Sequence, residues 1–329
     1  MNESNNSNTQ GINDSSRAPF EQLGFIDSPD DTIEGTENAD RISGDAKEGV
    51  GGSSNLPGPL AYWSFDSFLA GIYEDLRGGS SVSVHQLQNN TALPVTAGVT
   101  RAGPGGAADS ALVFNGEDTF AFIEHDPLME VTQGTVSVWI QPDELHECEQ
   151  IVLSKDEKNA GDGGHFRLGI DDGGRIFLRF AEGDGGSNKS WVSTKEYFTE
   201  GEWTHIAVSF TEDGITVYAD GVAVPDFGWY RKEGNLDSPA DATEAYILQN
   251  REPWLLGVDT SRTEVNDDPA AFAANTNNLD DAFAGAISDF GLWGGFEPGD
   301  ALDSGQVWDL FLHGPGDALT APSGPEPML

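Results

Sequence analysis

The stretch GEWTHIAVSFTEDGITVYADGVAV (residues 201–224) decides the fold of this chain. Within it, residues 203–210 and 215–221 are rich in apolar and β-branched residues, which predicts two β-strands. Thr-Glu-Asp-Gly stands between them, so we expect the two strands to form a tight hairpin. A second turn signal, Asp220-Gly221, follows. The stretch therefore predicts antiparallel β structure rather than helices.

Short apolar segments separated by Gly, Asn and Asp continue in both directions from this hairpin. Residues 135–142 (TVSVWIQP) alternate, with Val136, Val138 and Ile140 on one side. ALVFNG (111–116) and FAFIE (120–124) predict a further hairpin. The remaining predicted strands are 61–65, 151–155, 165–171, 175–180, 253–258 and 283–294.

About eleven to thirteen strands of regular spacing predict an all-β fold, a two-sheet antiparallel sandwich of the jelly-roll type. One short C-terminal helix is predicted over residues 303–312, where Val307, Leu310 and Phe311 are spaced for one apolar face.

The charge of the chain limits its partners. It has 56 acidic and 16 basic residues and a formal net charge of −40. Such a surface repels phosphate, so we expect no nucleic-acid partner. The sequence has no run of apolar residues long enough for a membrane span, so no membrane insertion is expected. A high-salt habitat, divalent-cation binding and a well-solvated extracellular surface each explain the acidity.

Three regions are predicted along the chain. Residues 1–58 begin with MNESNNSNTQGINDSS, which is typical of disorder, and they form a flexible acidic arm. This arm has neither the basic nor the apolar region of a secretory signal peptide. Residues 59–315 hold the strands, and residues 316–329 form a C-terminal tail.

The strands, in this order, resemble the LamG-like jelly-roll family of the concanavalin A-like lectin/glucanase superfamily, which includes laminin G domains and pentraxins. The resemblance covers residues 59–315. Its motifs include AYWSFD (61–66), GTVSVWIQPDE (134–144) and FAGAISDFGLWG (283–294), and the most specific is the G-x-W-x-H-[VI]-A hairpin of residues 201–224. Four tryptophans are expected in the core: Trp63, Trp139, Trp203 and Trp293. His205 is interpreted as a buried structural histidine.

The resemblance implies a calcium site, because several members of this superfamily bind Ca²⁺ on loops at the sheet edge. The positions carried over are Asp162, Asp259, Asp280 and Asp281. Oxygen ligands from separate loops are how a hard cation is held, so Ca²⁺ is expected as a structural or ligand-bridging cofactor. In the alternative interpretation, these residues are ordinary polar turn residues.

A second feature bears on location. GTENADRIS, within residues 35–46, resembles one RTX nonapeptide repeat. A single degenerate repeat cannot stack into a calcium-binding roll. Such segments are common in acidic proteins that are exported by type I secretion without an N-terminal signal peptide. We therefore expect an extracellular or cell-surface protein.

The connection from Pro225 to Pro253 is longer than is usual in the family. It carries the aromatic and basic cluster Trp229, Tyr230, Arg231 and Lys232. Aromatic faces stack on sugar rings and Arg binds hydroxyls or carboxylates, so the cluster is a candidate ligand-binding site. In the alternative interpretation, it is a packed flap with Trp229 against the sheet.

No pair of carboxylates with the spacing of glycanases on this fold is found, nor is a nucleophile elbow, a P-loop or an H-E-x-x-H motif. The predicted function is therefore a secreted, non-catalytic recognition module that binds glycans or a cell or matrix surface with the assistance of Ca²⁺. One alternative is a structural, self-associating subunit of an extracellular assembly. Another is a glycan hydrolase or lyase on the same fold.

Overall fold

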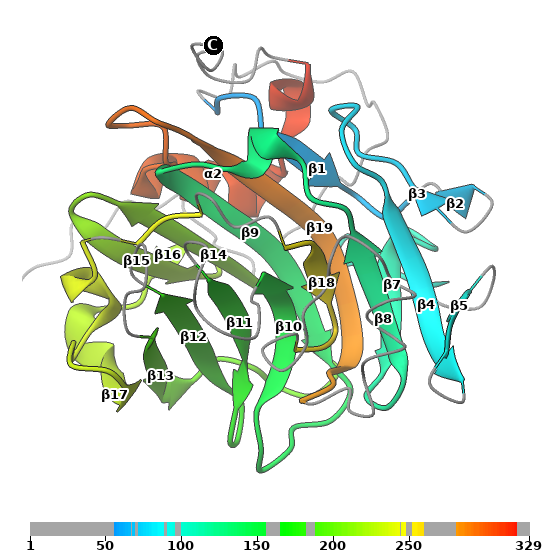
Figure 1. Ribbon diagram of the computed structural model, residues 1–329, viewed down its shortest axis with the longest axis horizontal. Helices are drawn as coiled ribbons and strands as arrows, with labels where there is room; N and C mark the ends of the chain where they lie inside the picture. The colour runs from blue at the N-terminus through cyan, green and yellow to red at the C-terminus, as the bar shows by residue number, and fades with distance from the viewer. Residues whose placement is uncertain are drawn as a thin grey trace, which may run out of the picture. The chain divides into compact units, whose positions relative to one another are not determined.

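The computed structural model describes residues 56–66, 68–69, 72–88, 91–95, 100–155, 165–181, 188–243, 245–247, 252–259 and 281–320 (Figure 1). The chain divides into the units Met1–Asn38 and Ala39–Leu329, and every described residue belongs to the second unit. Most of the predicted N-terminal arm, including the RTX-like segment 35–46, lies outside the described residues. Among the helices that are described, none has the length and apolar character needed to cross a bilayer.

Two antiparallel sheets form the second unit. In the helix-side sheet, the strands follow the order β16-β15-β14-β9-β19-β7-β6, and β1 pairs with β19. Their bounds are β1 (Ala61–Trp63), β6 (Thr100–Arg101), β7 (Ala111–Asn115), β9 (Gln133–Pro142), β14 (Thr204–Thr211), β15 (Gly214–Ala219), β16 (Val222–Ala223) and β19 (Ala284–Gly295).

The site-side sheet follows the order β17-β13-β12-β11-β10-β18-β8-β4-β3-β2, and β5 pairs with β4. Its strands are β2 (Phe68–Leu69), β3 (Ile72–Tyr73), β4 (Val82–Gln88), β5 (Thr91–Pro94), β8 (Thr119–Ile123), β10 (Gln150–Lys155), β11 (Phe166–Asp171), β12 (Arg175–Ala181), β13 (Asn188–Glu196), β17 (Trp229–Glu233) and β18 (Trp254–Leu256). The two sheets confirm the predicted antiparallel sandwich.

The core lies between the sheets, because alternate residues of each strand point inward. On β9 the inward residues are Val136, Val138 and Ile140, as predicted. On β11 they are Phe166, Leu168 and Ile170. The other residues of β11 therefore face outward, and two of them, Arg167 and Asp171, contribute to the site described below.

Helix α2 (Ser304–His313) covers the outer face of the helix-side sheet (Figure 1). It begins with a capping box in which Asp303 accepts a hydrogen bond from the backbone N–H of Gln306 at 2.9 Å. Val307 and Leu310 are buried against the sheet, which confirms the predicted helix. Residues from the start and end of the described chain, Leu56 and Ala318, join the same apolar cluster. Four short 3₁₀ helices complete the fold: η1 (Pro127–Met129), η2 (Asp226–Gly228), η3 (Pro239–Asp241) and η4 (Gly316–Leu319).

The hairpin that decides the fold is present. Strand β14 pairs with β15 from Thr211↔Gly214 to Ile206↔Ala219, which leaves a two-residue loop. The next turn, Asp220-Gly221, has φ angles of 49° and 75°. Two left-handed residues in a two-residue loop are characteristic of a type I′ turn, and this turn leads into β16.

One predicted hairpin is wrong. Strands β7 and β8, predicted to pair with each other, belong to different sheets. Both are short and apolar, so their pattern cannot indicate which sheet they join. Between them, Gly116 has a φ of 71° and the Asn115 side chain accepts hydrogen bonds from three backbone N–H groups, which fixes the corner at which the chain crosses the sandwich.

Two other expectations need correction. The described residues form 19 strands, more than predicted, because short strands between Phe68 and Arg101 and the polar strands β13 and β17 carry little apolar pattern. Trp63, Trp139 and Trp293 are buried as predicted, whereas Trp203 is only half-buried because it precedes β14. His205 is buried, and its Nε2 hydrogen-bonds with Ser137 Oγ at 2.8 Å, which confirms its structural interpretation.

Candidate functional site

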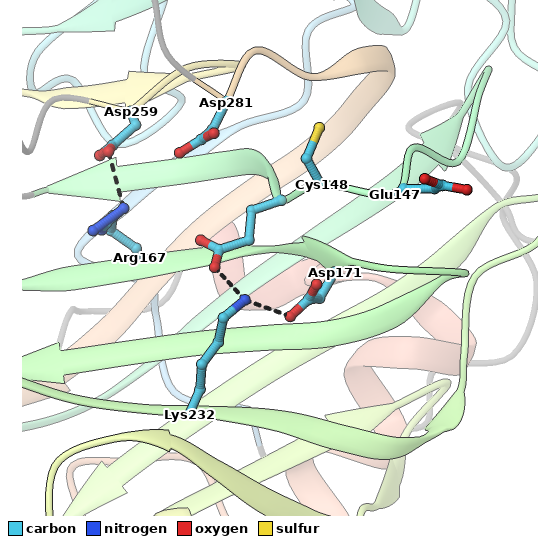
Figure 2. A pocket seen from close by; sticks show the side chains of 8 residues that line it. Glu147, Cys148, Arg167, Asp171, Lys232, Asp259 and Asp281 are labelled. Carbon is cyan, nitrogen blue, oxygen red and sulfur yellow. Dashed lines mark hydrogen bonds and ion pairs between the residues drawn. The ribbon is translucent and has the colours of Figure 1, made fainter.

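A pocket of about 450 Å³ lies at one end of the site-side sheet (Figure 2). It opens where β10 begins, where β11 ends, after β18 and before β19. Segments distant in sequence meet here because neighbouring antiparallel strands place their ends at the same edge. The pocket is lined by Glu147, Cys148, Glu149, Arg167, Asp171, Lys232, Asp259 and Asp281.

An ion pair between Arg167 and Asp259 forms one side of the pocket. Nη1 of Arg167 donates to Oδ2 of Asp259 at 2.9 Å, and the two side chains are 10% and 3% exposed. Asp259 is placed by the turn at Gly257, whose φ is 85°. A Cβ atom at Gly257 would lie 2.4 Å from the Phe114 ring, so glycine lets the chain pass close to the core here.

A second charged group crosses the pocket from β17. Nζ of Lys232 donates to Oδ2 of Asp171 at 2.7 Å and also contacts Oε1 of Glu149. The ammonium group lies 5.4 Å from the centre of the Phe177 ring, within the range of a cation–π contact. Partial burial lowers the pKa of Lys232, but the hydrogen bonds and charges of Asp171 and Glu149 raise it more, so its net pKa is raised. Lys232 is therefore charged over the whole physiological pH range.

Asp281 is fixed in the segment just before β19. Its φ is 55°, a left-handed conformation that Asp tolerates better than most residues. Its carbonyl oxygen accepts a hydrogen bond from the N–H of Ile151 at 2.7 Å, which attaches it to β10. In Figure 2 its carboxylate points into the same space as that of Asp259.

The four predicted calcium ligands divide into two groups. Asp259 and Asp281 line one pocket, whereas Asp162 and Asp280 lie outside the described residues. Within the described part of the chain, no group of three or more His, Cys, Asp or Glu side chains is placed to hold a metal. The carboxylate of Asp259 is also engaged by a guanidinium. These described residues alone do not fit a calcium site, and calcium binding remains a prediction.

The predicted aromatic and basic cluster lies on β17, an edge strand that pairs with β13. Trp229 is 8% exposed and packs into the core, as the packed-flap interpretation expects. Tyr230 is exposed, and Arg231 forms an ion pair with Asp237 at 3.4 Å. Of the four residues, Lys232 is the one that lines the pocket.

Arg167, Asp171 and Glu149 were not predicted as site residues. Arg167 and Asp171 carry one available signal, because they are charged residues at alternating positions of the strand HFRLGID. That pattern marks the face opposite the core, but it does not show which distant residues meet them. Glu149 directly precedes β10 and shows no distinctive pattern.

Residues 115–257 match a family model, Laminin_G_3, described as the concanavalin A-like lectin/glucanase superfamily. The matched region contains most of the site-side sheet and the hairpin of β14 and β15. The resemblance to this superfamily that the sequence indicates is confirmed over these residues, and the RTX-like segment lies outside them. The comparison with curated proteins found no match.

Several solved structures are similar. Domain 4 of AbnA, an extracellular arabinanase from Geobacillus stearothermophilus in complex with arabinotriose, has 19% identity and a TM-score of 0.49, and the match covers 78% of this chain and 99% of that one. A SAP-like pentraxin from Limulus polyphemus has 17% identity and a TM-score of 0.41, over 61% and 81% of the two chains. Trypanosoma rangeli sialidase in complex with sialic acid has 14% identity and a TM-score of 0.51, over 86% of this chain and 37% of that one. At this identity, the sialidase match supports the fold alone.

Proposed function

We propose that this protein is a non-catalytic recognition module that binds neutral glycans in the pocket of Figure 2, at the cell surface or outside the cell. The observation that carries the proposal is the pair of fixed charge contacts in one pocket, Arg167 with Asp259 and Lys232 with Asp171. A sugar hydroxyl both donates and accepts hydrogen bonds. Neighbouring basic and acidic side chains, already held in place, therefore suit pairs of adjacent hydroxyls.

The charge of the pocket favours a neutral sugar over other ligands. Its lining includes five carboxylates, on Glu147, Glu149, Asp171, Asp259 and Asp281, and two basic groups. This excess of negative charge, in a chain of net charge −40, disfavours phosphates and acidic sugars. The nearly continuous polar lining also disfavours an apolar ligand.

The same contacts support binding over hydrolysis. Glycosidases that use two carboxyl groups need one of them to hold a proton for the leaving group. Asp259 and Asp171 instead each accept a hydrogen bond at Oδ2, from a guanidinium and from an ammonium group, so these oxygens are already engaged by fixed donors. The superfamily description covers both lectins and glucanases, so this argument rests on the site and not on the family.

A glycan array that carries neutral and acidic oligosaccharides tests the proposal. We expect binding to neutral glycans and a loss of at least tenfold in affinity for Asp281→Asn, which removes a pocket carboxylate and tolerates the left-handed backbone. The control is Asp172→Asn, because Asp172 is exposed and does not line the pocket. Absence of binding to all neutral glycans, or release of reducing sugar from any of them, would contradict the proposal.

A further inference from the structure

Strand β17 forms one edge of the site-side sheet, and its pairing is irregular at Lys232. Arg231 lies opposite Trp191 of β13, and Glu233 lies opposite Ser190. Lys232 between them has no opposite residue, so it is the extra residue of a β-bulge. Bulges redirect a side chain away from the regular alternation and are common next to functional sites. Here the bulge accompanies a lysine that reaches across Phe177 into the pocket.

The two acids that hold the Lys232 ammonium come from separate parts of the fold. Asp171 ends β11, whereas Glu149 belongs to the segment before β10. Their carboxylates converge on one point, and Nζ lies at that point (Figure 2). Carboxylate oxygens from separated segments are also the arrangement by which proteins hold a divalent cation. An ammonium group with three donors can satisfy such oxygens without a metal.

We propose that Lys232 is the built-in cation of the pocket: its ammonium group takes the position between Glu149 and Asp171 that a divalent ion would otherwise occupy, so that the pocket is organised without Ca²⁺. This inference rests on the proposed glycan-binding function, because it names the group that orders the proposed glycan-binding pocket. Lys232 is a positioning residue, and the edge strand β17 is the element that supplies it.

The second acidic position follows the same principle. The guanidinium of Arg167 pairs with the carboxylate of Asp259, which is one of the residues expected to bind calcium. Both basic groups approach from the sheet face, Arg167 from β11 and Lys232 from β17. The negative charges of the pocket are therefore neutralised at two positions by basic side chains of the same chain, Arg167 and Lys232, and these positions do not need a bound ion.

Thermal unfolding with Ca²⁺ alone tests the inference and needs no identified glycan. The proteins are the wild type, Lys232→Met, Lys232→Gln and the control Arg231→Met, each measured in EDTA and in millimolar Ca²⁺. Arg231 is adjacent on the same strand, and its ion pair with Asp237 lies outside the pocket. We expect equal melting temperatures in both buffers for the wild type and for Arg231→Met.

In Lys232→Met and Lys232→Gln, the two carboxylates lose their cation. We expect both variants to gain a Ca²⁺-dependent rise in melting temperature, and Glu149→Gln in either background to remove it. A rise in the wild type that Glu149→Gln abolishes would show that the ion already binds there and would overturn the inference. No Ca²⁺ response in both folded Lys232 variants would overturn it too. Because these readouts use the metal alone, a failure to bind glycans would be seen separately on the array.

Discussion

Arg167 and Asp259 form a buried ion pair that joins β11 to the chain beyond β18. The two residues are 92 positions apart in the sequence, and their atoms Nη1 and Oδ2 are 2.9 Å apart. Neither side chain is more than 10% exposed. Such a pair loses hydration when it forms, so its net contribution to stability is small while each member is costly to remove alone.

The first prediction is that Arg167→Met lowers the free energy of unfolding by about 3–5 kcal/mol, because it removes the guanidinium that pairs with the buried Asp259 carboxylate. The double variant Arg167→Met/Asp259→Leu is expected to recover most of this loss. Urea unfolding measures the free energy of unfolding of both variants. Arg175→Met is the control, because its pairs with Asp172 and Glu196 are more exposed, and it should cost at most about 1 kcal/mol. A similar cost for Arg167→Met and its control would contradict the prediction.

This ion pair also affects how calcium binding can be tested. Asp259→Ala would remove the carboxylate that pairs with the buried Arg167 guanidinium, and the protein would lose stability whether or not Ca²⁺ binds. A lower melting temperature of that variant therefore says nothing about the metal. The Ca²⁺-dependent difference in melting temperature, measured for each variant in EDTA and in Ca²⁺, is the informative quantity.

A second prediction concerns Asp75, a buried carboxylate near β1. Its Oδ1 accepts hydrogen bonds from the N–H groups of Tyr62 and Arg77, and its Oδ2 accepts one from Gly79, each at 2.9 Å. In Asp75→Asn, an amide NH₂ group must face one of these donors. We expect a loss of about 1–3 kcal/mol in the free energy of unfolding, measured in urea. Asp66→Asn, at an exposed position, is the control, and equal stability of the two variants would refute the role of Asp75.

A third prediction concerns pH. His85 is buried, stacks on Phe120 with ring centres 5.4 Å apart, and contacts Ser83 Oγ at 2.8 Å. Burial lowers the pKa of His85 below its ordinary value. The unfolded chain therefore binds more protons than the folded one just below the ordinary pKa, so stability falls as the pH falls through that value.

His85→Asn removes this titration. We expect the free energy of unfolding of the wild type to fall more steeply than that of His85→Asn between about pH 7.5 and about pH 5. Urea unfolding at a series of pH values measures the two slopes. The absolute stability of the variant is not the readout, because the loss of the ring contact with Phe120 lowers it at every pH. Parallel curves would show that His85 does not titrate as inferred.

Much of the fold could be predicted because its signals are local. The alternation of 135–142 gives β9 with its core face, and the turn residues between β14 and β15 define their hairpin. The pairing of β7 and β8 with different sheets could not be predicted in the same way. Strand β7 pairs with β19 and strand β8 pairs with β18, and both partners are distant in sequence. The residue pattern of two short apolar strands does not indicate such distant partners.

The site shows the same division. Asp259, Asp281 and Lys232 were predicted from a resemblance and from composition, in two separate groups, and the fold brings all three to one pocket. Their partners Arg167 and Asp171 were not identified, because an ion pair between residues far apart in sequence leaves no spacing to detect. The cluster at 229–232 was predicted as one surface, but strand geometry separates its members: Trp229 enters the core and Lys232 reaches the pocket.

The last prediction returns to the hairpin that decides the fold. Gly214 begins β15 with a φ of 123°, and a Cβ atom there would lie 2.1 Å from the carbonyl oxygen of Ala240. Gly214→Ala must therefore both adopt a strained backbone conformation and displace the chain at η3. Gly201 separates the two causes, because it has a φ of 76° but nothing within 4 Å of its Cβ position. We expect Gly201→Ala to cost about 1–2 kcal/mol from conformation alone, and Gly214→Ala to cost clearly more in urea unfolding. Equal losses would mean that the chain at Ala240 moves away freely and that its contact with the hairpin contributes nothing to stability.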